Sequence, residues 1–149
     1  MREPFFYDII IVTKKSPEEF LCAVITLEEV GAILDEIAEE LPKEFYRELN
    51  GGVVLLPQVK LHPSSLETNR LYVLGEYHHD PRGLGRYIAI YYGSFVRAHG
   101  HETLERQKGH LRDVLCHEFT HHMESLAGER GLEIKDAVQI AQYRQRFEQ

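Results

Sequence analysis

The segment His117-Glu118-Phe119-Thr120-His121 constrains this chain most, because its chemistry requires a helix. Residues four apart on an α-helix project from nearly the same side, one turn above the other, so the two imidazoles can converge on one cation. Neutral imidazole nitrogens suit zinc, and a catalytic zinc site keeps one position for a water that a neighbouring carboxylate can deprotonate. The segment therefore predicts a metal-binding helix with His117 and His121 as ligands and Glu118 as the general base.

Apolar residues around this motif recur at helical spacing. They are Leu104, Leu111, Leu115, Phe119 and Leu126. At about 100° per residue, this stripe lies roughly opposite the two histidines, so we expect one face of the helix to pack and the other to present the ligands. The alternative is a solvated, histidine-rich helix face without a metal, which the motif in its helical context disfavours.

Length and composition limit the classes of protein that fit. A chain of 149 residues, 43% of them hydrophobic, suffices for one core and is short for two domains. The net charge is −7 and the 17 basic residues are scattered, which argues against a nucleic-acid partner. Two cysteines give no disulfide framework, and the apolar run at 5–12 is too short to span a membrane. We expect a cytoplasmic protein with no membrane partner.

Hydrophobic periodicity and turn residues divide the chain into strands and helices. Strands are predicted over 5–13, 53–56, 71–77 and 86–92. Helices are predicted over 17–24, 26–41 (from the capping box of Thr26), 42–49, the motif region up to Gly128, and 136–147. The strands at 71–77 and 86–92 form a hairpin with a long loop at 78–85.

We expect the strand at 86–92 to bind extended substrate by edge pairing. Tyr91 or Tyr92 could stabilise an oxyanion, although packing is the preferred role.

A catalytic zinc site needs a third protein ligand, and three acidic residues follow the motif. Glu124 lies on the same helix face but must reach back, whereas Asp136 lies past the glycines, where the chain can return to the metal. Asp136 could equally cap the last helix, and Glu133 is a weaker candidate. The neighbouring His122 points toward the packed side and is expected to be a core histidine or one that supports the ligands.

Five segments of the chain carry a resemblance to a known family. They are Leu41-Pro42, Leu49-Asn50, Leu74-Gly75-Glu76-Tyr77, Ile90-Tyr91-Tyr92-Gly93-Ser94-Phe95 and His117-Glu118-Phe119-Thr120-His121-His122. In these the chain resembles the minimal zincin-like metallopeptidases of bacteria, once known as a domain of unknown function. The likeness begins at about Thr26, so it implies one domain over 26–149, with 1–25 as an N-terminal extension.

The resemblance implies a compact α+β zincin-like domain, in which a small, mostly antiparallel sheet packs against helices including the motif helix. It also implies bound Zn2+, His117 and His121 as ligands, and Glu118 as the base. Many relatives read H-E-x-x-H-H-x-G-x-x-D, in which the aspartate completes the site. Here Glu124 replaces the glycine, and the nearest counterpart of the aspartate is Asp136. The expected function is a zinc metallopeptidase acting on a peptide or protein. The alternative is a metal-stabilised binding or regulatory domain that cleaves nothing.

Overall fold

In the computed structural model, residues 6–13, 24–128 and 131–147 are described, with backbone alone for 6–13 and 131–137. The predicted helix over 17–24 lies outside these residues except for Val24, which is not helical. The elements are β1 (Phe6–Thr13), α1 (Leu27–Glu40), the 3₁₀ helix η2 (Lys43–Tyr46), β2 (Gly52–Leu56), β3 (Asn69–Asp80), β4 (Gly85–Tyr91), α2 (Tyr92–His99), α3 (Leu104–Ala127) and α4 (Gly131–Phe147). None of the described helices is long and apolar enough to cross a membrane.

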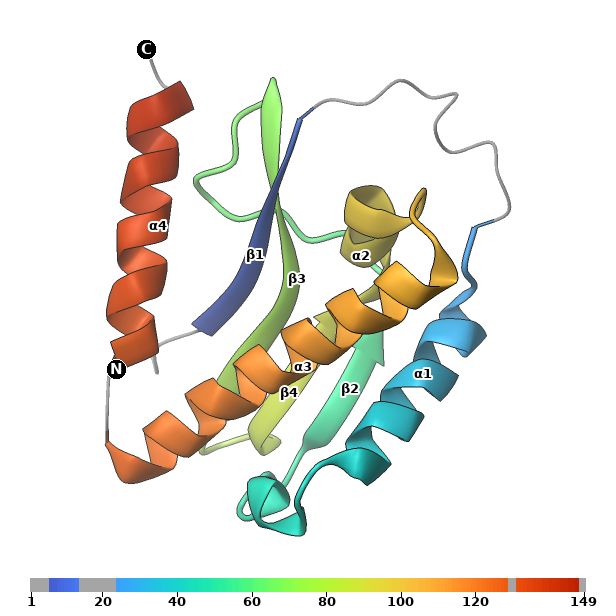
Figure 1. The fold of residues 1–149 in the computed structure, drawn as a ribbon. Helices are drawn as coiled ribbons and strands as arrows, with labels where there is room; N and C mark the ends of the chain where they lie inside the picture. The colour runs from blue at the N-terminus through green and yellow to red at the C-terminus, as the bar shows by residue number, and fades with distance from the viewer. Residues whose placement is uncertain (1–5, 14–23, 129–130, 148–149) are drawn as a thin grey trace.

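The four strands form one sheet in the order β1-β3-β4-β2. β3 pairs antiparallel with both β1 and β4, whereas β2 pairs parallel with β4. Figure 1 shows α3 crossing one face of this sheet, with α1 beside it and α4 next to β1. The predicted fold class, α+β with a small and mostly antiparallel sheet packed against the motif helix, is therefore confirmed.

The main core lies between the sheet and the layer formed by α1 and α3. Its buried side chains include Val30, Ile33 and Ile37 from α1, Leu74 and Tyr77 from β3, Ile88 and Ile90 from β4, Phe95 from α2, and Leu111, Leu115 and Phe119 from α3. A smaller buried cluster on the opposite face contains Val73, Ala89 and Tyr91. Alternation along β4 separates the two sets, because successive strand residues point to opposite faces.

β4 is an interior strand, so the expectation that residues 86–92 bind substrate by edge pairing is wrong. Ala89 is paired with Glu76 of β3 on one side and with Val54 of β2 on the other. A strand whose two edges are both hydrogen-bonded has no row of free backbone groups for an extended peptide. β2, which precedes β3 in the sequence, covers the second edge of β4 by parallel pairing. The local sequence pattern of residues 86–92 does not reveal this pairing.

An irregularity in β3 sets the distance between the sheet and α3. Asp8 pairs with Gly75 and Ile9 with Val73, so the register skips Leu74. The extra residue leaves Leu74 and Gly75 facing the same side, as in a β-bulge. A Cβ placed on Gly75 would be 3.0 Å from Cγ1 of Val114 on α3. The glycine therefore allows α3 to approach the sheet closely at this point.

Several predicted elements differ from the observed ones, including the helix predicted over 42–49, of which only 43–46 is helical. β3 continues through His78 and His79 to Asp80, so the hairpin turn is shorter than the predicted loop. Residues 92–99 form a separate helix, α2, which the sequence pattern did not indicate. α4 begins at Gly131, which places Asp136 inside a helix. The alternative in which Asp136 caps the last helix is therefore wrong. The capping box of Thr26 and Glu29 is confirmed by both of its hydrogen bonds.

Candidate metal centre

The two motif histidines face each other from consecutive turns of α3. Their Nε2 atoms are 3.1 Å apart, and the rings meet edge to face with centroids 4.7 Å apart. Two nitrogens bound tetrahedrally at about 2.0–2.1 Å from one zinc would be about 3.3 Å apart. The observed separation is close to that value, so His117 and His121 fit as two ligands of one zinc ion.

Glu118 follows the first histidine and lies against the sheet. Its side chain is fully buried. Cγ is 3.3 Å from the position that a Cβ on Gly75 would occupy, close to the bulge in β3. The Glu118 side chain is therefore packed between α3 and β3, close to the bulge.

The burial of α3 differs from the expected division into a packed and an open face. Leu111, Leu115 and Phe119 are buried as predicted, but Leu104 is 51% exposed. Glu118 and His121 are both 0% exposed and His117 is partly buried, so the side of the helix that carries the motif is largely covered as well. The expectation failed because the sheet is wider than the apolar stripe of α3. Residues beside the stripe, such as Glu118, are therefore buried as well.

The third ligand remains a prediction. Asp136 and Glu133 both lie in α4, in the part of that helix for which backbone alone is described. α4 does contact α3, which brings the two segments into the same region of the molecule. Glu124 lies in the last turn of α3 and is partly buried.

His122 is a core histidine, as expected. It is fully buried, and its Nε2 is 2.8 Å from the carbonyl oxygen of Arg47, which can only accept a hydrogen bond. Its Nδ1 therefore accepts from the Tyr77 hydroxyl at 2.8 Å, and that hydroxyl accepts from Arg86 Nη1 at 2.9 Å. Burial lowers the pKa of His122 below its usual value of 6.5. This chain of hydrogen bonds fixes α3 to β3 and β4 one residue after His121.

The two tyrosines considered as oxyanion stabilisers have other partners. The Tyr91 hydroxyl donates to Glu76 on the sheet face opposite α3, and the Tyr92 hydroxyl donates to the carbonyl oxygen of Ile25. The preferred role in packing is therefore supported for both. Glu76 is fully buried, and one of its oxygens also accepts from Lys60.

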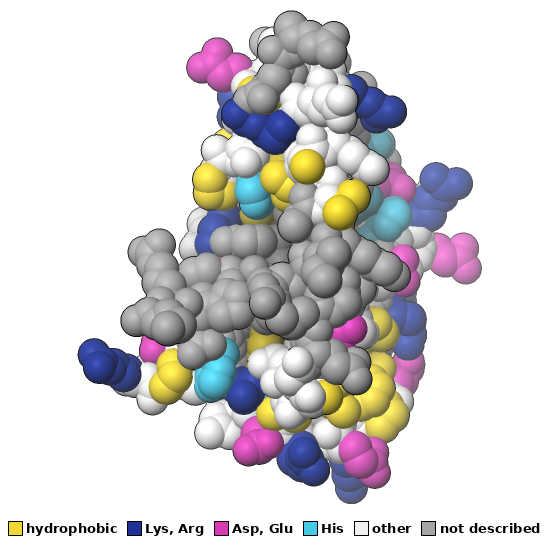
Figure 2. Space-filling model, turned by 90° about the vertical axis from the view of Figure 1, so that its left-hand side faces the viewer, with side chains coloured by type: hydrophobic (Ala, Val, Ile, Leu, Met, Phe, Trp, Pro, Cys, Tyr) yellow, Lys and Arg dark blue, Asp and Glu magenta, His cyan; other side chains and the backbone are white. Residues whose placement is uncertain are grey.

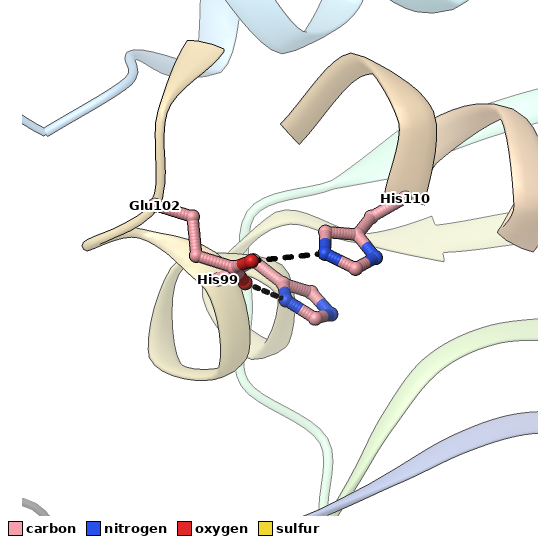
Figure 3. A group of neighbouring side chains, drawn as sticks. All are labelled: His99, Glu102 and His110. Atoms are coloured by element: carbon pink, nitrogen blue, oxygen red, sulfur yellow. Dashed lines mark hydrogen bonds and ion pairs between the residues drawn. The ribbon is translucent and has the colours of Figure 1, made fainter. Parts of the chain in front are cut away.

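A second group of metal-ligand side chains was not anticipated. His99, Glu102 and His110 meet where α2 leads into α3, and potential ligand atoms of the three lie within 4.8 Å of one another. Figure 3 shows both imidazoles beside the carboxylate. In the sequence, the only indication of this group was that His99 and Glu102 are three residues apart. Their contact with His110 depends on the turn between α2 and α3, which the sequence pattern did not predict.

The comparisons with known proteins include a solved structure of similar sequence. A conserved hypothetical protein from Thermus thermophilus is 34% identical to this chain, with a TM-score of 0.57. The match covers 98% of that protein and 69% of this chain. No family model matches the chain, and neither does any curated protein.

Proposed function

This chain belongs to the family of the conserved hypothetical protein from Thermus thermophilus, and we propose that it is a zinc-dependent hydrolase of the metallopeptidase type. The observation that carries the proposal is the pair of Nε2 atoms of His117 and His121, 3.1 Å apart, on a helix whose residue Glu118 is fully buried. The resemblance to the minimal zincin-like metallopeptidases supports the same conclusion, with Asp136 as the proposed third ligand.

In this proposal a bound zinc ion supplies a Lewis acid and lowers the pKa of a water. His117 and His121 would hold the ion through nitrogens from two consecutive turns of one helix. Glu118 would accept a proton on its carboxylate and return it to the leaving nitrogen of the substrate. The position of Glu118 against Gly75 limits the conformations that its side chain can adopt, and such restriction favours a fixed position for the proposed base.

The proposed substrate is a peptide or protein, and nucleic acid is not proposed as a partner. Among the described residues on the face drawn in Figure 2, Lys and Arg side chains are interspersed with Asp and Glu and do not form a stripe. Binding of a phosphate backbone requires clustered positive charge, and the net charge of −7 also disfavours such binding.

One observation favours a second candidate, a metal-stabilised binding domain without hydrolytic activity. Glu118 and His121 are 0% exposed, so a peptide bond can reach them only if a covering segment moves. β1 contacts both β3 and α3, so it lies in the same region as the motif helix. A binding domain needs no such movement, because a closed metal site stabilises a fold without access for substrate.

The test combines metal content with hydrolysis of a fluorescently labelled, denatured protein. Wild type is expected to contain zinc and to release labelled peptides. Glu118→Gln is expected to keep its zinc and to lose hydrolysis by at least about 100-fold, the range for removal of a general base. Glu105→Gln is the matched control, because Glu105 is an exposed glutamate in the first turn of the same helix.

Each outcome distinguishes the candidates. If Glu118→Gln loses zinc and activity together, the carboxylate is not acting as the base. Zinc-loaded wild type that cleaves no peptide would support the binding domain. Asp136→Ala is expected to lower the zinc content at this centre, and a variant that retains full zinc would remove Asp136 from the ligand set.

A further inference from the structure

Three side chains from separate elements meet near the start of α3. His99 is the last residue of α2, Glu102 lies in the connection that follows, and His110 lies in the second turn of α3. The Nδ1 atom of His99 contacts one oxygen of Glu102, and His110 Nε2 is 3.1 Å from the other oxygen. One carboxylate therefore links two imidazoles, as Figure 3 shows.

This set of donors fits a divalent cation of the zinc type. Two imidazole nitrogens and one carboxylate oxygen are the protein ligands of many zinc sites, whereas magnesium and calcium prefer oxygen alone. The candidate ligand atoms already lie within 4.8 Å of one another, and zinc requires about 3.3 Å between them. Small side-chain rotations would bring them to that spacing. Zinc binding also requires that the imidazole nitrogens now facing Glu102 carry no proton.

The surroundings hold the cluster in place and leave one side open. The His99 and His110 rings are stacked, with centroids 3.7 Å apart and planes 15° apart. The backbone carbonyl of His99 accepts from the Gln107 side chain at 3.0 Å, and the imidazole of His99 is only 5% exposed. The His110 side chain is 34% exposed, which gives a cation and a water ligand a route from solvent.

The cluster is separate from the HExxH centre, although both lie along α3. His110 precedes His117 by seven residues, which is roughly 10 Å along a helix. Two metals that act on one substrate lie about 3.5–4 Å apart, so this distance excludes a shared two-metal centre. From the donors, their arrangement and this distance, we propose that His99, Glu102 and His110 form a second zinc site that fastens the end of α2 to the start of α3.

The proposal is tested by titrating Zn2+ into the full-length protein while recording the imidazole ¹⁵N resonances. The signals of His99 and His110 are expected to shift together and to saturate, while Mg2+ leaves them unchanged. His110→Ala is expected to weaken Zn2+ binding at His99 at least tenfold. This variant should fold, because His110 is partly exposed. Glu102→Gln is the second variant, and His101→Ala, at an exposed neighbouring histidine, is the matched control that binds as wild type does.

The resonances of individual imidazoles separate this site from the proposed catalytic centre. Shifts at His117 and His121 alone would support that centre and overturn the second site. Shifts at His99 and His110 alone would support the second site whatever the state of the motif. Unchanged affinity at His99 in both His110→Ala and Glu102→Gln would also overturn the proposal.

Discussion

Replacing Gly75 by alanine tests whether the close approach of α3 to the sheet positions the motif. The added Cβ would lie 3.0 Å from Val114 Cγ1, 3.2 Å from Ile90 Cδ1 and 3.3 Å from Glu118 Cγ. Comfortable contact between carbon atoms is about 3.5–4.0 Å, so all three contacts are too short by several tenths of an ångström. Either α3 moves away from β3 or the side chains leave their preferred rotamers.

The expected cost follows from this overpacking. Inserting a methyl group into a filled core typically costs about 1–3 kcal/mol, and 1 kcal/mol corresponds to a change of about 2–4 °C in Tm for a chain of this size. Gly75→Ala should therefore lower the Tm by about 2–12 °C. Because one of the three contacts is with Glu118, the variant should also lose hydrolytic activity if the proposed function holds.

Gly109→Ala, on α3, provides a control at a glycine with free space around it. A Cβ on Gly109 would meet nothing within 4 Å, and alanine is favoured over glycine in a helix by up to about 1 kcal/mol. The Tm should therefore rise by about 2–4 °C. The two Gly→Ala changes thus have opposite expected signs, because a methyl group at Gly75 meets three close atoms, whereas at Gly109 it meets none and helix propensity favours alanine.

Thermal unfolding followed by circular dichroism measures both variants, and Val114→Ala completes a double-mutant cycle. Val114→Ala removes the nearest atom to the new methyl group, so the Gly75→Ala change should cost less in its presence, with a coupling of at least about 0.5 kcal/mol. An unchanged Tm for Gly75→Ala, or strict additivity with Val114→Ala, would refute the argument that this glycine sets the spacing.

Two further predictions concern buried polar groups. Tyr77→Phe leaves His122 Nδ1 without its hydrogen-bond donor, so it should destabilise the protein by about 1–3 kcal/mol in denaturant unfolding; a change below about 0.5 kcal/mol would contradict this. Burial raises the pKa of Glu76, but its interactions with His78, Lys60 and Tyr91 outweigh burial and leave the pKa below 4.5. The stability from this carboxylate is therefore present above pH 4.5 and lost as the pH falls through the folded pKa. Glu76→Gln should reduce the dependence of Tm on pH below about 4.5, and an unaltered acid limb would contradict the assignment.

The sequence predicted those features that depend on neighbouring residues. The capping box at Thr26 and Glu29 is a local signal, because both hydrogen bonds join residues three apart. The meeting of His117 and His121 is equally local, since the geometry of one helix is enough to bring them together. These were therefore readable without knowledge of the tertiary structure.

The features that sequence reasoning missed depend on distant contacts. β4 is interior because β2 pairs with it although β3 lies between them in the sequence, and no pattern within residues 86–92 reveals that. α2 forms from a segment that contains a glycine and a serine near its start, and the burial of Phe95 helps to hold it in place. Likewise, the contact of His110 with Glu102 requires the chain to turn at Gly100 and to restart at the Thr103 cap.

The continuous run of α3 from Leu104 to Ala127 determines where the chain can change length. One residue inserted between His110 and His117 would rotate one part of the helix by about 100° relative to the other, so either histidine would turn away from its partners. Gly128 ends the helix with a φ of 77°. A residue inserted after Gly128 would therefore not rotate His110 relative to His117. Related chains should therefore conserve the spacing before Gly128 and vary in the number of residues between the motif and the acidic residue of α4.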